Sequence, residues 1–340
     1  MRRPNARRIR EPEPLTPSAA WWRGSIAWPG SPQPGPRGRS PMRRRIVVLL
    51  LPALLAPAGC TGEAADGMEL KVGGAFGARP TIVFPAGKPV DELQVDELAA
   101  GKGERLRPDD VAIVQYTAHV WNGRDNRLVD SSFTRGTPAA FPVGRLLPGL
   151  ERALRGRRVG SRVIAAIPPG DGFGANPPRG IAADEELFYV VDILGAHPKG
   201  ASVKARGGSL AGVRVSGGAR PALSVPATAP PARFAAKVLH RGKGRRTQAG
   251  QLVVTQYEGA IWGRRRVFDA TWTTGGPKAF KLGDGGVIKA WDKALVGVPT
   301  GSRVVMVVPP SYGYGRSGSP AYGVKGSDTL AFVVDVIAAY

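Results

Sequence analysis

The chain has 340 residues, a length typical of about two domains, and its 42% hydrophobic content is enough for folded cores. Its 48 Lys and Arg against 26 Asp and Glu give a formal net charge of +22. One cysteine and three well-separated histidines exclude an internal disulfide framework and offer no metal-ligand spacing.

The first 41 residues are rich in Arg and Pro and show no hydrophobic period. We therefore expect residues 1–41 to be either a disordered extension or the result of a start site placed too early. In the second case Met42 is the true initiator, and the sequence leaves this choice open.

Residues 42–60 have the features of an export signal. Three arginines follow Met42, a short apolar stretch follows them, and small residues precede Cys60. This stretch is shorter than the about 18 residues of a membrane-spanning helix. It resembles a bacterial lipoprotein signal, in which the cysteine is lipidated, although Pro57 stands where an aliphatic residue is usual. A buried free cysteine is the alternative. The resemblance implies an exported protein held by Cys60 on the outer face of the bacterial cytoplasmic membrane, with 61–69 as a tether.

The positive charge is spread along the chain. Residues 1–60 carry +9, which leaves +13 for the other 280 residues. This balance suits a protein close to anionic lipid or cell-wall polymer. A nucleic-acid-binding protein would show a clustered basic stripe with aromatics or a known motif. Neither is present, so we expect no nucleic-acid partner.

Two halves of the chain repeat each other at an offset of 141 residues, with local offsets of 139 and 143. Gln115-Tyr116 recurs as Gln256-Tyr257, and the segment 160–163 recurs as 301–304. Such matches predict two copies of one domain, at 70–196 and 212–340. Residues 197–211, rich in Gly, Ser, Ala and Lys, have the composition of a flexible linker.

Strands dominate each predicted copy. β-branched and apolar runs predict strands at 111–120, 162–167 and 188–194, and again at 252–261, 303–308 and 330–337. One short helix per copy is predicted at 149–155 and at 287–296. In the second of these helices Ile288, Trp291 and Leu295 form an inward stripe. These elements predict an α+β domain in which the helix covers one face of an antiparallel sheet.

The sequence lacks a phosphate-binding loop, a serine nucleophile elbow, a metal-binding helix and a cysteine nucleophile. The second copy instead carries a series of aromatic motifs: Tyr257, Phe268-Asp269, Phe280-Lys281-Leu282-Gly283, Val287-Ile288 followed by Trp291, Tyr312-Gly313-Tyr314-Gly315, and Phe332 three residues before Asp335. In this order they resemble the FKBP-type peptidyl-prolyl isomerases, over residues 105–196 and 247–340. The resemblance implies two tandem domains, each a curved antiparallel sheet wrapped on one short helix.

The resemblance also implies a site in the second copy. Trp291 would form the pocket floor, Asp269 and Tyr314 the polar rim, and the Ile288 N–H and the Tyr314 hydroxyl would meet substrate carbonyls. The implied walls are Tyr257, Phe268, Phe280, Val287, Ile288 and Phe332. Lys278 stands where the family usually has an aromatic residue, and a family position in the loop 319–324 has no secure match. The resemblance therefore specifies the activity more fully than the substrate preference.

Isomerisation of an X-Pro bond makes and breaks no covalent bond, so the site needs no nucleophile, metal or cofactor. The amide loses its resonance and polarity at the twisted transition state. A dry aromatic pocket and donors placed for the twisted carbonyl would favour that state. The resemblance implies proline-containing polypeptides as partners and macrolides as inhibitors. It names no client and no oligomeric state.

Three functions compete at this point. The first is an isomerase acting mainly through the second copy. The second is a non-catalytic chaperone or scaffold of the same fold, with aromatics that serve as core. The third is a cell-wall attachment protein that uses its charge.

The first copy keeps only part of the site. Leu150 stands in place of the floor tryptophan, Val129 in place of a wall phenylalanine, and Phe173 in place of the tyrosine that carries a hydroxyl. The candidate residues are Tyr116, Val129, Asp130, Phe141, Leu147, Leu150, Phe173 and Tyr189. We expect weaker binding and turnover there, or a peptide-binding or spacer domain.

Overall fold

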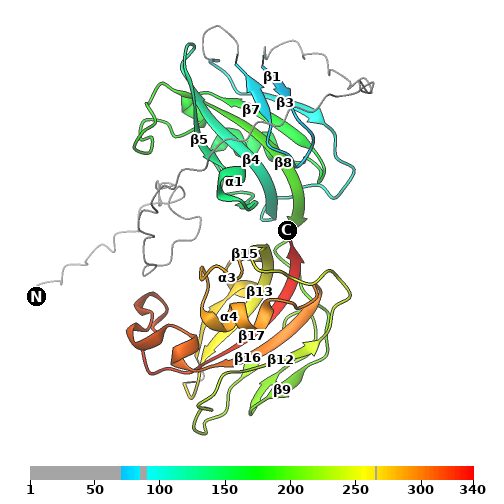
Figure 1. Ribbon diagram of the computed structural model, residues 1–340, viewed down its shortest axis with the longest axis vertical. Helices are drawn as coiled ribbons and strands as arrows, with labels where there is room; N and C mark the ends of the chain where they lie inside the picture. The colour runs from blue at the N-terminus through cyan, green and yellow to red at the C-terminus, as the bar shows by residue number, and fades with distance from the viewer. Residues whose placement is uncertain (1–69, 85–89, 265) are drawn as a thin grey trace, which may run out of the picture.

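The computed structural model describes residues 70–84, 90–264 and 266–340. Two units of the same architecture follow each other along the chain (Figure 1). The expected extension, export signal with Cys60, and tether all lie outside the described residues. Within the described residues, no helix is both long and apolar enough to cross a bilayer.

The first unit is built on a six-stranded antiparallel sheet of order β3-β7-β8-β4-β5, with β6 paired to β4. Its elements are β1 (Lys71–Gly73), β2 (Thr81–Val83), β3 (Gln94–Ala99), β4 (Val111–Trp121), β5 (Asn126–Ser131), α1 (Ser132–Arg135), β6 (Ala139–Pro142), α2 (Pro148–Leu154), β7 (Arg162–Ile167), the 3-10 turn η2 (Pro169–Asp171) and β8 (Glu186–His197).

The second unit repeats this sheet as β12-β16-β17-β13-β14, with β15 paired to β13. Its elements are β9 (Gly208–Leu210), β10 (Val213–Val215), β11 (Leu223–Ser224), β12 (Ala235–His240), β13 (Leu252–Ile261), β14 (Arg266–Ala270), α3 (Thr271–Thr274), β15 (Lys278–Lys281), α4 (Lys289–Leu295), β16 (Ser302–Val308), the 3-10 turns η3 (Pro310–Tyr312), η4 (Gly315–Ser317) and η5 (Pro320–Tyr322), and β17 (Leu330–Ala339).

The predicted α+β fold of two related domains is confirmed, and all six predicted strands are present with small changes in their bounds. Both predicted helices are present as α2 and α4. The sequence did not predict α1 and α3, because a four-residue helix is too short to show a hydrophobic period. Helix α1 is instead set by its ends: the Ser131 hydroxyl accepts a hydrogen bond from the Phe133 N–H, and Gly136 closes the helix at φ 66°.

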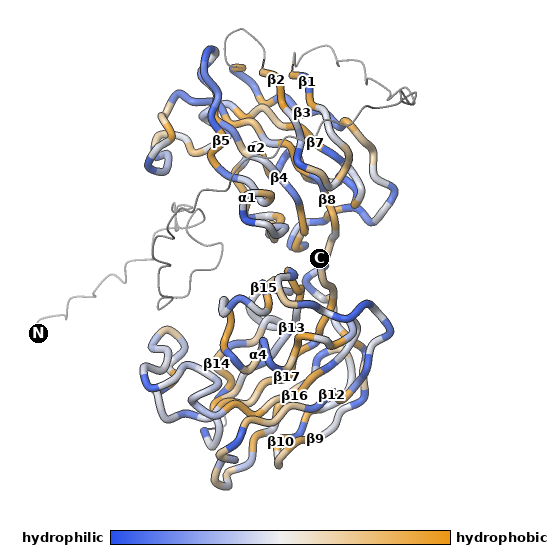
Figure 2. Tube along the Cα trace, in the orientation of Figure 1, coloured by the Kyte–Doolittle hydropathy of each residue, from blue (hydrophilic) through white to orange (hydrophobic). Residues whose placement is uncertain are grey.

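Both faces of each sheet are covered. On one face the sheet packs against α2 or α4. On the other face, the small sheets β1-β2 and β9-β10-β11 supply apolar side chains such as Val72 and Val213. Because both faces are covered, every residue of β7 and β16 is buried, and these strands are apolar apart from Arg162, Ser302 and Arg303 at their starts (Figure 2).

The segment 197–211 differs from the flexible linker that its composition predicted. The Val203 N–H donates to Asp335 at 2.9 Å, and the Val203 carbonyl accepts from Arg303 at 2.7 Å. Arg303 and Asp335 form a fully buried ion pair. The segment also contributes β9 to the small sheet of the second unit. A few buried contacts therefore fix a stretch whose composition favours flexibility.

The two units meet where β8 and β17 end (Figure 1). One apolar cluster joins them, built from matching positions of the two repeats. Val111 matches Leu252, Ile113 matches Val254, Ala140 matches Ala279, and Leu194 matches Ile337. A contact in which both partners present the same patch is isologous.

Candidate active site

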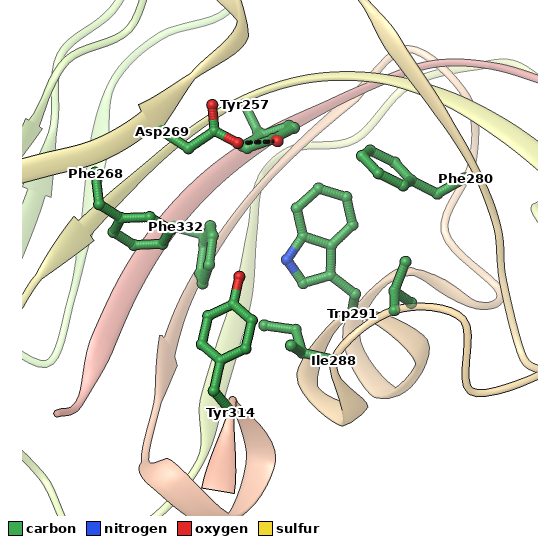
Figure 3. A pocket seen from close by; sticks show the side chains of 9 residues that line it. Tyr257, Phe268, Asp269, Phe280, Ile288, Trp291, Tyr314 and Phe332 are labelled. Carbon is green, nitrogen blue, oxygen red and sulfur yellow. Dashed lines mark hydrogen bonds between the residues drawn. The ribbon is translucent and has the colours of Figure 1, made fainter. Parts of the chain in front are cut away.

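An aromatic pocket of about 340 Å³ lies in the second unit, between the sheet and α4 (Figure 3). Nine residues line it, and all nine were predicted as site residues: Tyr257, Phe268, Asp269, Phe280, Val287, Ile288, Trp291, Tyr314 and Phe332. They come from β13, β14, β15, the residues just before α4, α4 itself, the loop after β16, and β17.

The buried indole of Trp291 forms the floor of the pocket. Three rings meet it at steep angles, with centroid distances of 5.1 Å for Tyr257, 5.2 Å for Phe280 and 5.9 Å for Phe332. Edge-to-face contacts of this kind are favourable and hold each ring at a fixed angle. Within the described residues, the Trp291 indole N–H has no hydrogen-bond partner. The floor therefore offers a flat apolar surface with one donor at its edge.

Tyr257 and Asp269 form the polar side of the pocket. The Tyr257 hydroxyl donates to the Asp269 carboxylate at 2.5 Å (Figure 3). Burial, followed by the charge of Asp269, raises the pKa of Tyr257 above its ordinary value. The hydroxyl therefore keeps its proton at physiological pH and remains a donor to the carboxylate.

Tyr314 approaches from the opposite side, and its hydroxyl points into the pocket (Figure 3). Burial raises the pKa of Tyr314, so this group also stays protonated. Ile288 precedes α4 with an extended backbone, and its carbonyl accepts a hydrogen bond from the backbone N–H of Trp291 at 2.9 Å. Within the described residues, no cluster of side chains suited to a metal is found. The site therefore joins apolar walls with protonated hydroxyl groups.

A family model described as FKBP-type peptidyl-prolyl cis-trans isomerase matches residues 102–194 and 243–337, more than half of the chain. The chain belongs to this family. Both units contain a match, so the protein has two FKBP domains.

Named relatives agree with this assignment. The FK506-binding protein of Streptomyces anulatus is 36% identical over 119 residues, which cover 35% of this chain and 96% of that protein. The human peptidyl-prolyl cis-trans isomerase FKBP10 is 27% identical over 239 residues, which cover 69% of this chain and 35% of that protein. The chain thus spans only about a third of the length of FKBP10.

Among solved structures, the three FKBP domains of wheat FKBP73 match with 21% identity and a TM-score of 0.30. That match covers 73% of this chain and 94% of the wheat chain.

In the first FKBP domain, the predicted site residues also come together, but several of them are packed into the hydrophobic core. Tyr116, Leu150 and Tyr189 are buried in the core, and Tyr189 stacks on Tyr116 at 6.0 Å. The Tyr116 hydroxyl donates to Asp130, as its counterpart does in the second domain. Val129, Phe141, Leu147 and Phe173 pack against this core.

Phe173 lines a smaller hollow of about 180 Å³ in the loop after β7. The hollow also contains Pro169, Ile181 and Leu187, but none of the other seven candidates. The first domain therefore keeps the Tyr–Asp pair, whereas Phe173 also borders a separate hollow.

Three residues of the second site were missed by sequence reasoning. Tyr322 stacks on Tyr314 at 6.2 Å and meets Phe268 edge-on at 5.8 Å. Gly259 lies against two wall rings. Lys278 was noted only as a departure from the family, yet its ammonium lies beside Tyr257. For Tyr322, an aromatic residue in the unmatched loop 319–324 was the available signal.

Proposed function

We propose that the second domain carries most of the prolyl isomerase activity of this chain. The observation that supports the proposal is the floor: Trp291 is held edge-on by three aromatic rings. Leu150 occupies the matching position of the first domain and packs in its core.

The geometry suits rotation about an X-Pro bond. The proline ring would rest on the indole, and the apolar walls would keep water from the amide. Twisting the amide removes its resonance and reduces its dipole, so a dry pocket disfavours the planar ground state more than the twisted state. Hydroxyl donors such as Tyr314 would bind the substrate carbonyls and hold the peptide in the twisted geometry. No proton needs to leave the enzyme.

Substitution of Tyr314 provides a direct test. We expect Tyr314→Phe to lower kcat/KM for a short Ala-Leu-Pro-Phe peptide about tenfold, because the variant loses one hydrogen bond to the substrate. Tyr312→Phe is the matched control, since Tyr312 stacks on Phe234 and does not line the pocket. Equal rates for both variants would count against a role for this hydroxyl.

FK506 is proposed as a ligand of the same pocket. The Streptomyces anulatus relative is named an FK506-binding protein, and the pocket here offers the apolar floor and walls that a macrolide needs. FK506 should compete with the peptide and quench the fluorescence of Trp291.

For the first domain we propose peptide binding with little turnover. Its Tyr116–Asp130 pair is retained, whereas the floor is an aliphatic side chain. If the second domain were also to bind peptides without accelerating their isomerisation, the whole protein would be a non-catalytic chaperone with an FKBP fold.

We further propose that the clients are exported proteins and that a lipid on Cys60 holds the enzyme at the outer face of a bacterial cytoplasmic membrane. The sequence of residues 42–60 supports this proposal. Labelled fatty acid should enter the protein in a bacterial host, and Cys60→Ala should prevent the labelling and release the protein from the membrane fraction. Label that remains in the Cys60→Ala chain would contradict the proposal.

A further inference from the structure

Both domains place a cation against the partly buried Tyr–Asp pair. In the first domain this cation is Arg135, the last residue of α1. Arg135 forms an ion pair with Asp130 and donates to the Tyr116 hydroxyl at 2.9 Å. Its guanidinium lies 5.3 Å from the centre of the Tyr116 ring.

The second domain has no cation at that position. Thr274 occupies the matching place in α3, and its hydroxyl donates to the Ala270 carbonyl at 2.8 Å. Lys278 supplies the charge instead, four residues later in β15. Its ammonium lies 3.3 Å from the Tyr257 hydroxyl and 3.4 Å from the Asp269 carboxylate.

The exchange is reciprocal. Ala139 of the first domain, which matches Lys278, is neutral, just as Thr274 is neutral where Arg135 is charged. Among the described residues, each domain therefore pairs one cation with this aspartate, and the two cations come from different elements. The aspartate of each Tyr–Asp pair is therefore balanced by a cation, which stands at a different sequence position in each domain.

We propose that Lys278 is a positioning residue of the second pocket. Lys278 neutralises Asp269 and thereby determines whether the pocket prefers an acidic, neutral or basic residue before the substrate proline. This inference rests on the proposed isomerase activity of the second domain. Asp269 lines the pocket with its side chain only 10% exposed. An anion so buried is costly unless it is paired, and it would repel substrate carbonyls and acidic side chains.

The position of Lys278 allows it to act on substrate as well as on Asp269. Lys278 and Phe280 alternate with Ala279 along β15, so they point to the same face of the strand, and Phe280 is a pocket wall. The Lys278 side chain is 44% exposed. A residue that flanks the bound proline at the mouth of the pocket would therefore lie within the field of this ammonium.

Three peptides that differ only before proline, Ala-Glu-Pro-Phe, Ala-Leu-Pro-Phe and Ala-Lys-Pro-Phe, test the inference with the whole chain. In Lys278→Met, Asp269 is left without its counter-charge. We expect KM to rise most for the Glu peptide and least for the Lys peptide, so that the Lys-to-Glu ratio of kcat/KM increases about tenfold. This increase in the Lys-to-Glu ratio should be smaller in about 1 M salt, which screens charges beyond a few ångströms. The rate of a Trp291→Leu chain gives the background from the first domain.

A relocation variant separates charge from shape. Thr274→Arg combined with Lys278→Ala moves the cation to the position used by the first domain, and it should restore the wild-type ratio, as should Lys278→Arg alone. Lys281→Met is the matched control, because Lys281 pairs with Asp284 at 3.6 Å and does not line the pocket. It should leave the ratio unchanged.

The outcomes are distinguishable. A Lys278→Met chain that loses activity equally on all three peptides would overturn the inference and leave the isomerase proposal intact. A wild-type chain that isomerises none of the peptides would instead overturn the proposed function. In that case calorimetric binding of the same peptides still tests Lys278, and an unchanged order of affinities in Lys278→Met would refute its role.

Discussion

Gly259 of β13 lies opposite Phe332 of β17, and a Cβ atom at position 259 would lie 2.7 Å from the Phe332 ring and 2.8 Å from the Phe268 ring. The missing side chain is therefore part of the pocket wall. In the first domain Ala118 occupies this position, where Val129 replaces the larger phenylalanine.

We expect Gly259→Ala to displace both rings and to weaken peptide binding about tenfold, since overpacking a core typically costs about 1–3 kcal/mol. Calorimetric titration with a proline peptide measures the effect. Ala118→Gly makes the reverse change in the first domain and should leave binding by the second domain unaltered. Unchanged affinity in Gly259→Ala would show that the rings have room to move.

The resemblance predicted the walls of the pocket but not this glycine. A glycine in a strand gives no chemical pattern in the sequence. That this position must lack a side chain becomes clear only when the neighbouring rings are placed. Lys278 is similar, because which carboxylate it meets depends on the pairing of β15 with β13. By contrast, the strands 162–167 and 252–261 were predicted closely, since the first is an apolar run after Arg162 and the second is rich in β-branched and aromatic residues.

Glu186 offers a test of stability against pH. It is fully buried at the start of β8, where one carboxylate oxygen accepts the Val90 N–H at 2.9 Å and the other has no partner among the described residues. Burial raises the pKa of Glu186 to about 7. Since this lies above the value of about 4.3 in an unfolded chain, the folded state binds the proton more tightly.

The stabilising effect of protonated Glu186 is therefore complete below about pH 4 and is lost as the pH rises through 7. Each pKa unit corresponds to about 1.4 kcal/mol, so we expect Glu186→Gln to be more stable than wild type by roughly 3–4 kcal/mol at pH 8 and nearly equal to it at pH 4. Urea unfolding at both pH values measures this difference. Glu92→Gln is the exposed control, and a Glu186→Gln chain that matches wild type at pH 8 would contradict this expectation.

The contact between the two domains can be tested at Gly195. A Cβ atom there would overlap the Tyr340 hydroxyl, which also lies 2.8 Å from Nε2 of His197. Burial at this junction raises the pKa of Tyr340 to about 12. We expect Gly195→Ala to separate the domains and to increase the radius of gyration in small-angle X-ray scattering, with circular dichroism unchanged.

Gly200→Ala is the matched control, because a Cβ atom at position 200 meets nothing within 4 Å. Scattering from this variant should equal that of the wild type. If Gly195→Ala also scatters like the wild type, the junction does not depend on the close approach of Tyr340.

If the Trp291 pocket performs the isomerisation, as we propose, kcat/KM for Ala-Leu-Pro-Phe should differ sharply between the wild-type chain and Trp291→Leu. The substitution gives the second domain the floor residue of the first. Trp272→Leu is the control for loss of a buried tryptophan outside the pocket. We expect kcat/KM to fall at least tenfold in Trp291→Leu, to stay near wild type in Trp272→Leu, and to leave a small residual rate from the first domain. A Trp291→Leu chain as fast as wild type would contradict the proposal.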